Sequence, residues 1–300
     1  MARLSEADSP SDPAIEVAEL SKTFRGGVRA LDSVSLKVVS GEMVALIGSS
    51  GAGKSTLLRH ICGLTRADQG PGAGTVRVLG RSVQRNGRLS GEFRGLRQDL
   101  GVLFQQFNLV PRLSVLCNVL IGRLGRLPRY RSLTGLFPAR DQREAMRALD
   151  RVGIAETALQ RAQTLSGGQQ QRAAIARLMV QGARVVLADE PVASLDPASS
   201  RRVMELLAAL CNDAGVPILV SLHQVEYAWR YCSRTIAMRN GKVVFDGPSR
   251  ALDNRLLEEI YGSHSEELIF PGATCQTEGD ATVAAPVTPS KPLATGVRYV

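Results

Sequence analysis

An α/β fold built on a mixed sheet is the architecture that this sequence of 300 residues predicts. Short apolar runs alternate with segments whose apolar residues recur every three or four positions, as buried strands and amphipathic helices do. A stretch of strand-like segments precedes this alternation and predicts a small antiparallel β layer. A middle region without β-branched runs predicts a helical subdomain inserted into the α/β core.

The N-terminal half contains the β layer and the first strand–helix unit. Apolar positions between residues 15 and 38 predict strands separated by a turn at residues 25–27. Residues 43–47 form a continuous apolar run that ends in glycine, and leucines at helical spacing follow it, so a buried strand leads into a helix. Residues 68–74 are rich in Gly and Pro and predict a surface loop. Residues 92–162 carry helical spacing and predict the helical subdomain.

The α/β alternation returns from Leu165 onward. A helix is expected first, then a strand at residues 185–188, a helix at residues 203–210 and a strand at residues 218–220. Asn240-Gly241, flanked by two apolar runs, is typical of a tight hairpin turn. These elements predict one domain over residues 14–262, between an N-terminal segment of residues 1–13 and a tail of residues 263–300 that are both expected to be disordered.

Composition excludes several classes of protein. The chain is 44% hydrophobic and 22% charged, which is typical of a globular protein with a full core. Its five cysteines are widely spaced and include no C-x-x-C pair, so reduced thiols are expected. No run reaches the ~18 apolar residues of a membrane span, and no signal peptide is recognisable, so we expect a protein on the cytoplasmic side. The net charge is +9, but few aromatic residues lie between the arginines, so no nucleic-acid partner is expected.

A phosphate-binding loop follows the buried strand at residues 43–47. It matches the pattern G-x-x-x-x-G-K-S/T in the strand–loop–helix context that this pattern requires. Glycines allow the backbone N–H groups to surround phosphate oxygens, and the helix start adds positive partial charge. Lys54 is expected to reach the β- and γ-phosphates, and Ser55 to supply a hydroxyl ligand to Mg²⁺. The nucleotide-binding candidates in this stretch are Gly48, Ser49, Ser50, Gly51, Ala52, Gly53, Lys54, Ser55 and Thr56.

Two acidic residues end the predicted strand at residues 185–188. A phosphate loop alone leaves kinases, GTPases and many ATPases open, so this second site matters. Carboxylates at the C-terminal end of a strand in an α/β sheet suit a Mg²⁺ site and the positioning of an attacking water. We therefore assign Asp189 to the metal and Glu190 to the water.

A second anion-binding helix start is expected at Leu165-Ser-Gly-Gly-Gln169. Ser166 is a good N-cap, and Gly167 and Gly168 leave backbone amides accessible at the helix start. One bound nucleotide does not need two such ends. Here the sequence resembles the ATP-binding subunits of ABC transporters, in which the LSGGQ signature, with Ser166 to Gln169, closes over the γ-phosphate bound by a second subunit. The resemblance implies ATP and Mg²⁺ as cofactors and a head-to-tail dimer of two copies with two ATP molecules between them.

The resemblance extends over about residues 15–262 and implies further site residues. Gln105 matches the glutamine that contacts Mg²⁺ and links the site to the membrane partner, and Asp196 matches the loop that crosses the dimer interface. His223 matches the histidine that hydrogen-bonds the γ-phosphate. Phe24 stands where the family places an aromatic residue that stacks on adenine. Cys117 stands where relatives often carry Glu, which puts the local coupling contact in doubt.

Several stretches are similar to one subgroup, the ATP-binding subunits of phosphonate importers. They lie at residues 83–85, 87–89, 104–110, 112–115, 118–122, 133–137 and 223–232. The resemblance implies transmembrane permease subunits as partners, an extracytoplasmic phosphonate-binding protein that acts through the permease, and a peripheral place on the cytoplasmic face of the membrane. The open alternatives are an ABC-type subunit of the carbon–phosphorus lyase system and an importer of another phosphorus oxyanion, such as phosphite.

Overall fold

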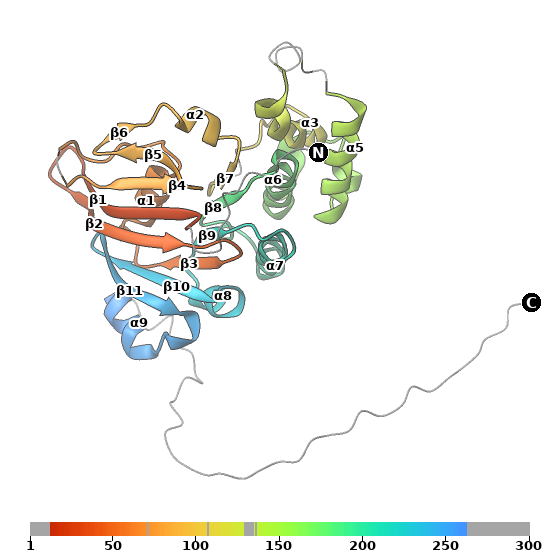
Figure 1. The fold of residues 1–300 in the computed structure, drawn as a ribbon. Helices are drawn as coiled ribbons and strands as arrows, with labels where there is room; N and C mark the ends of the chain where they lie inside the picture. Colours follow the sequence, from red (N-terminus) through yellow and green to blue (C-terminus); the bar gives the residue numbers. More distant parts are fainter. Residues whose placement is uncertain (1–12, 71, 107, 129–134, 136, 263–300) are drawn as a thin grey trace, which may run out of the picture. The chain divides into compact units, whose positions relative to one another are not determined.

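The computed structural model describes residues 13–262, apart from 71, 107, 129–134 and 136. The expectations for the tail, for almost all of the N-terminal segment and for most of the 133–137 stretch lie outside the described residues. The described residues form two sheets and a set of helices (Figure 1).

The larger sheet has six strands in the order β11-β10-β3-β9-β8-β7. All neighbours pair in parallel except the terminal hairpin β10–β11, so the predicted mixed sheet is confirmed. Its parallel strands end at one edge, where the functional side chains of an α/β protein gather. The strands are β3 (Met43–Ile47), β7 (Leu100–Leu103), β8 (Val185–Asp189), β9 (Ile218–Ser221), β10 (Arg234–Arg239) and β11 (Lys242–Pro248).

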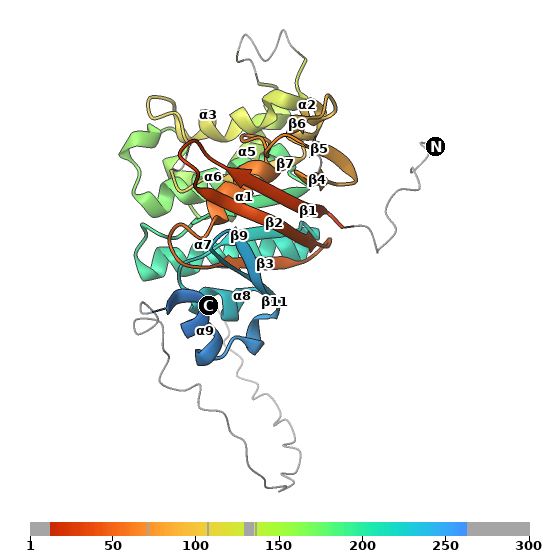
Figure 2. The ribbon, with the colours of Figure 1, turned by 90° about the vertical axis from the view of Figure 1, so that its left-hand side faces the viewer.

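The smaller sheet is entirely antiparallel, with the strand order β2-β1-β4-β5-β6 (Figure 2). It is the predicted β layer, and the turn expected at residues 25–27 joins its first two strands. The strands are β1 (Ile15–Thr23), β2 (Arg29–Val38), β4 (Thr75–Val78), β5 (Arg81–Arg85) and β6 (Arg88–Leu89).

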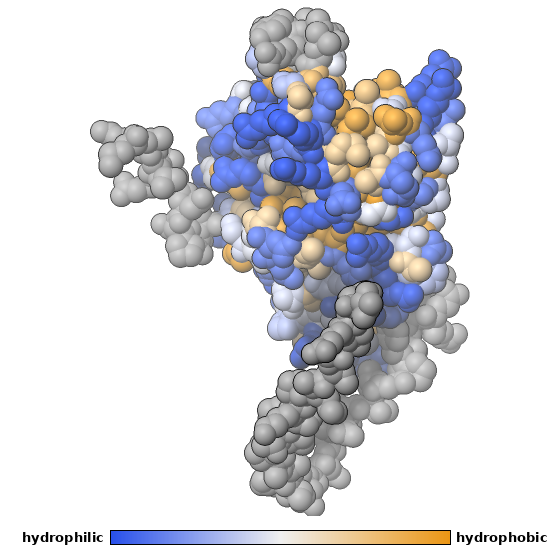
Figure 3. Space-filling model, turned by 90° about the vertical axis from the view of Figure 1, so that its right-hand side faces the viewer, coloured by the Kyte–Doolittle hydropathy of each residue, from blue (hydrophilic) through white to orange (hydrophobic). Residues whose placement is uncertain are grey.

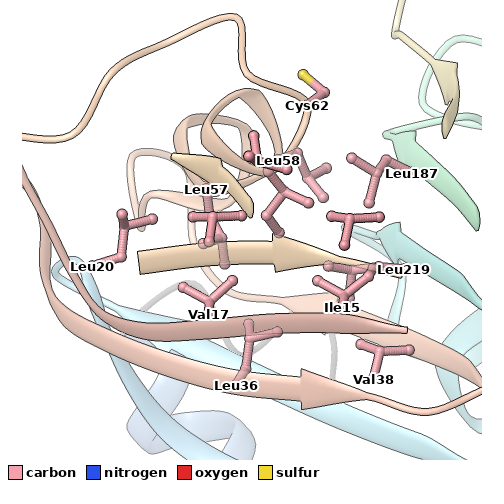
Figure 4. Close-up of a cluster of buried hydrophobic side chains, with 14 of the residues drawn as sticks. Ile15, Val17, Leu20, Leu36, Val38, Leu57, Leu58, Cys62, Leu187 and Leu219 are labelled. Carbon is pink, nitrogen blue, oxygen red and sulfur yellow. The ribbon is translucent and has the colours of Figure 1, made fainter. Parts of the chain in front are cut away.

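Helix α1 (Lys54–Ile61) packs against strands of both sheets. Its Leu57, Leu58 and Ile61 are buried in one apolar cluster with Val17 of the small sheet and Leu187 of the large one (Figure 4). Burial of an aliphatic side chain contributes about 1.5–3 kcal/mol, so this cluster fixes the helix in place. The start of α1, and with it the phosphate loop, is therefore held by the core.

A helical region follows the small sheet. Its central helix is α6 (Gly167–Gln181), which packs against α3 (Val115–Leu120), α5 (Ala139–Arg151) and α7 (Pro197–Ala214). The shorter elements are α2 (Phe93–Leu96) and the 3-10 helices η1 (Ile121–Arg126), η2 (Ala155–Thr157) and η3 (Ala162–Thr164).

Strand β7 differs from the helical expectation for residues 92–162. It forms the edge of the large sheet beside β8. A Cβ on Gly101 would lie only 2.8 Å from the Leu178 and Ala183 side chains, so glycine here permits close packing of α6 and its C-terminal loop on the strand. Four residues with a central glycine give too short a pattern to separate a strand from a helix.

The C-terminal part of the described chain contains α8 (Val225–Tyr231), η4 (Ser249–Ala251) and α9 (Asn254–Tyr261). The predicted hairpin is present between β10 and β11, and Asn240 and Gly241 both have positive φ angles, of 50° and 75°. No helix in this part or elsewhere among the described residues is both long and apolar enough to cross a bilayer.

Candidate active site

The loop of residues 48–55 joins β3 to α1 and depends on two glycines. A Cβ on Gly48 would lie 2.2 Å from the Met238 carbonyl oxygen, and one on Gly53 would lie 2.5 Å from that of Ala30. Gly53 is also the N-cap of α1, with a φ of 104° and no side-chain cap. The first N–H groups of α1 are therefore without a capping side chain, which is the arrangement that binds phosphate oxygens.

The Lys54 ammonium lies inside this loop. Its Nζ donates hydrogen bonds to the carbonyl oxygens of Gly48, at 2.6 Å, and Ser49, at 3.1 Å. Desolvation lowers the pKa of Lys54, while the nearby carboxylates of Glu190 and Asp189 act in the opposite direction. An ammonium has three donors, and these two hydrogen bonds use two of them. The third N–H of Lys54 can donate to an anion bound in the loop.

Ser55 and Asp189 meet at the ends of α1 and β8. The Ser55 hydroxyl donates to Asp189 Oδ1 at 2.9 Å, and the carboxylate is buried. Hydroxyl and carboxylate oxygens are ligands that Mg²⁺ prefers, and Mg²⁺ is commonly bound by one or two protein groups together with substrate phosphates. The hydroxyl of Ser55 and the carboxylate of Asp189 therefore fit a Mg²⁺ ion that is bound together with a nucleotide. Among the described residues, no group of three or more His, Cys, Asp or Glu is placed to hold a metal ion.

Glu190 and His223 form a pair at the same edge. His223 Nε2 lies 2.6 Å from Glu190 Oε1, and Glu190 adopts a left-handed backbone conformation with φ of 50°. A non-glycine residue in this conformation is strained and is held there by its surroundings. A carboxylate with a fixed direction can orient a water molecule and accept its proton.

A single pocket joins the phosphate loop to this pair. Its lining combines the α1 start with the residues that follow strands β8 and β9, which end side by side in the sheet. Predicted residues from three separate stretches of sequence, namely most of the phosphate loop, Glu190 and His223, thus line one pocket. The lining residues are Ala30, Ser50, Gly51, Ala52, Gly53, Lys54, Ser55, Thr56, Glu190 and His223.

The signature residues do not line this pocket. Ser166 is the N-cap of α6 and accepts a hydrogen bond from the Gln169 N–H at 3.3 Å, while the Gln169 side chain accepts one from the Ser166 N–H at 3.0 Å. This reciprocal capping box satisfies two donors of the helix start. Gly167 is the first helical residue, and none of the signature residues lines the phosphate-loop pocket.

The start of α7 lies directly against the signature helix. A Cβ on Gly168 would lie 2.6 Å from Ser199 Oγ. Asp196 is the N-cap of α7, and its carboxylate accepts a hydrogen bond from the Ser199 N–H at 2.9 Å. Hydrogen bonds from Ser199 lower the pKa of Asp196. The signature and the residues that precede α7 therefore form one packed unit.

Besides the signature residues and Asp196, several expected residues do not line the pocket, namely Gly48, Ser49, Asp189, Gln105 and Phe24. Gln105 is exposed just beyond β7, and none of the hydrogen bonds of the described residues joins it to Ser55 or Asp189. Phe24 lies in the turn after β1 with an exposed ring, and Lys22 Nζ lies 5.6 Å from its centroid. Cys117 is exposed on α3.

The sequence does not predict two residues that contact the site, Tyr261 and Ser221. The Tyr261 hydroxyl, on α9, accepts a hydrogen bond from the Gly48 N–H at 3.3 Å, and burial raises the pKa of Tyr261 to about 12. Ser221 hydrogen-bonds both Asp189 and the Glu190 backbone. The available signal for Ser221 is a lone hydroxyl at the end of an apolar strand, whereas no local pattern points to Tyr261.

The fold and the pocket define a class of protein. A mostly parallel sheet with a phosphate loop after β3, a histidine after the neighbouring strand β9 and two carboxylates at the end of β8 is a P-loop nucleotide-hydrolase architecture. Residues 31–193 match the family model described as "ABC transporter". The chain belongs to the ABC transporter family.

Curated relatives carry the name of ATP-binding proteins for phosphonates import. The chain is 58% identical over 268 residues to the phosphonates import ATP-binding protein PhnC of Cupriavidus pinatubonensis, covering 89% of this chain and 94% of that protein. It is 59% identical over 250 residues to the protein of the same name from Stutzerimonas stutzeri, covering 83% and 90%.

Solved structures agree with the fold. The dimeric structure of MJ0796, a bacterial ABC transporter cassette, superposes with a TM-score of 0.68 at 31% identity, covering 79% of this chain and all of that one. A second dimeric structure of that cassette, in a post-hydrolysis state bound to ADP and Pi, superposes with a TM-score of 0.65 at 31% identity. The match again covers 79% of this chain and all of that one.

Proposed function

We propose that this chain is the ATP-hydrolysing subunit that energises phosphonate import through a separate permease. The pocket that joins the phosphate loop to the Glu190–His223 pair is the observation that carries the ATPase assignment. The cargo follows from the curated relatives, which are phosphonates import ATP-binding proteins over most of this chain's length. The chain would supply energy, while selectivity would lie in the permease and in an extracytoplasmic binding protein.

Hydrolysis would divide between groups that bind phosphate and groups that activate water. The uncapped N–H groups of α1 and the Lys54 ammonium would bind the β- and γ-phosphates. Glu190 would accept the proton of the attacking water, and His223 would hold that carboxylate until it turns to the γ-phosphate. Phe24, with its exposed ring, would stack on adenine.

Mg²⁺ would accompany ATP. Ser55 and Asp189 would hold the ion, and Gln105 would join them once the nucleotide is present. When bound, Mg²⁺ supplies positive charge to the β- and γ-phosphate oxygens. Each of these three residues offers an oxygen ligand, in keeping with the preference of Mg²⁺.

The active unit would be a head-to-tail dimer. The chain carries two helix starts suited to phosphate, and only the start of α1 lines the phosphate-loop pocket. The start of α6, with Ser166 and Gly168, and the adjacent Asp196 would therefore serve the nucleotide of a second copy. The related cassette in its dimeric structures supports this arrangement.

A groove beside β7, η1 and α6 is a suitable place for the permease. Arg94, Arg97, Arg126 and Arg177 line it. Arg177 donates to the Asn108 carbonyl oxygen at 2.7 Å, and no carboxylate among the described residues pairs with it. An acidic cytoplasmic segment of the permease would supply that charge. Docking of the permease in this groove would place the chain on the cytoplasmic face of the membrane.

The side of the molecule that carries α5 and α6 has an apolar patch within a hydrophilic surface (Figure 3). Interaction surfaces often have this composition.

Growth measurements test the proposed function. A strain that lacks this subunit should not grow on an alkylphosphonate as the sole phosphorus source, while its growth on inorganic phosphate should be intact. The wild-type chain should restore growth, and chains with Lys54→Ala or Glu190→Gln should not, because the first weakens ATP binding and the second removes the base for hydrolysis. An uptake defect confined to phosphite or phosphate esters would mean that the importer carries that compound, and the proposed mechanism of ATP hydrolysis would still stand. Unchanged phosphonate uptake together with a defect in amino-acid or metal uptake would contradict the proposal.

A further inference from the structure

A buried serine lies where the two halves of the active site meet. Ser221 is the last residue of β9 and is fully buried. Its strand lies between β3, which leads into the phosphate loop, and β8, which ends in the acidic pair. In the register of the sheet, Ser221 stands opposite Leu46 on one side and Asp189 on the other.

The hydrogen bonds of the Ser221 hydroxyl have fixed directions. The Glu190 N–H donates to Ser221 Oγ at 2.8 Å, so the serine oxygen is the acceptor there. The single hydroxyl proton is then donated to Asp189 Oδ1, at 2.9 Å. One hydroxyl therefore contacts both acids of the site, one through its carboxylate and the other through its backbone.

The two hydrogen bonds of Ser221 fix the backbone of Glu190 and the carboxylate of Asp189. Glu190 has a strained left-handed backbone, and the bond to Ser221 is the hydrogen bond that holds its N–H. This conformation directs the Glu190 side chain to His223. Asp189 Oδ1 also accepts from Ser55, so the Ser221 bond would keep the carboxylate in place when the Ser55 hydroxyl turns to another ligand.

We propose that Ser221 is a positioning residue for hydrolysis. Its hydroxyl fixes the backbone of Glu190 and the carboxylate of Asp189 without touching the nucleotide. The rest of β9, Ile218 to Val220, is apolar and buried, so packing alone does not call for a hydroxyl at this end. This inference rests on the proposed hydrolytic function.

The test compares Ser221→Ala with Ser221→Thr, which keeps a hydroxyl, in the full-length chain. Ser221→Ala should lower kcat for ATP hydrolysis by roughly 10- to 100-fold, as loss of an outer hydrogen bond to a metal-binding carboxylate does. The KM for ATP should change little, because the phosphate-binding groups are untouched. Ser221→Thr should restore most of kcat. Ser249→Ala is the matched control, since Ser249 is also buried and hydrogen-bonds a side chain, Thr235, outside the pocket.

Amide hydrogen exchange gives a readout that does not depend on turnover. The Glu190 amide should exchange faster in Ser221→Ala than in the wild type and in Ser249→Ala, because it loses its acceptor. Wild-type kcat in Ser221→Ala, or unchanged exchange at Glu190, would overturn the inference. A wild-type chain that does not hydrolyse ATP would contradict the proposed function instead, and the exchange measurement would still decide the positioning of Glu190.

Discussion

Helices α1 and α6 both begin at glycine-rich sequence, yet their N-terminal ends differ. The start of α1 has Gly53 as its N-cap and no side-chain cap, and the Lys54 cation lies beside it. The start of α6 is capped by its own Ser166 and Gln169. An uncapped helix start with a cation needs an anion, whereas a self-capped start is stable alone. This difference supports the proposed dimer, in which the α1 end of each chain would bind a nucleotide and the α6 end would join it when a second copy arrives.

The largest effect should come from the acid beside the α1 pocket. Glu190→Gln keeps the shape of the side chain and removes the base, so phosphate release should fall by roughly 10²–10⁴-fold while ATP still binds. Glu226→Gln, an exposed change on α8, is the control and should hydrolyse ATP normally. Normal phosphate release from Glu190→Gln would remove Glu190 from the mechanism.

Lys54→Ala tests the need of the α1 end for a cation. Hydrogen bonds to charged groups contribute about 1.5–3 kcal/mol, so the Kd for ATP should rise by about 10- to 100-fold. Equilibrium binding of a fluorescent ATP analogue measures it. Lys37→Ala, which removes an exposed lysine of β2, should bind like the wild type. Equal affinity in Lys54→Ala would mean that the backbone amides alone bind the phosphates.

The α6 end can be tested through its contact with α7. Gly168→Ala introduces a Cβ against Ser199 and should destabilise the chain by about 1–3 kcal/mol, as overpacking does. Ser199→Gly in the same chain removes the obstructing atoms and should recover part of this loss. Thermal unfolding of the four combinations measures the coupling. Additive effects of the two changes would contradict direct packing between the signature and the start of α7.

The smallest effect concerns the bond behind the phosphate loop. Tyr261→Phe removes the acceptor of the Gly48 N–H and should lower the free energy of unfolding by about 1 kcal/mol. Tyr227→Phe, on α8, is the control for loss of a tyrosine hydroxyl. An unchanged free energy of unfolding in Tyr261→Phe would show that α9 does not support the loop.

The sequence predicts the parts of the site that lie in contiguous patterns. Each of three features is predicted from a stretch of about ten residues: the phosphate loop, the acidic strand end at Asp189 and the hairpin at Asn240. The structure has each of them at its predicted place. Local geometry such as a glycine turn or a strand end depends on near neighbours, which explains this agreement.

Contacts between distant segments are harder to predict. Tyr261 reaches Gly48 across 213 residues, and Ser221 reaches Asp189 across 32. Each depends on how strands and helices are ordered in space, which periodicity does not encode. The sequence does not predict strand β7, because Gly101, required by packing against α6, interrupts an already short apolar run.

We propose that the α1 end of one chain and the α6 end of another complete one site. Mixing a Lys54→Ala chain with a Ser166→Arg chain gives dimers in which one site carries both lesions and the other carries neither. ATP-dependent association and nucleotide occlusion, measured by sedimentation with labelled ATP, should appear in the mixture and be weak in either parent alone. If the mixture shows no more association or occlusion than the two parents, the two ends do not form a shared site.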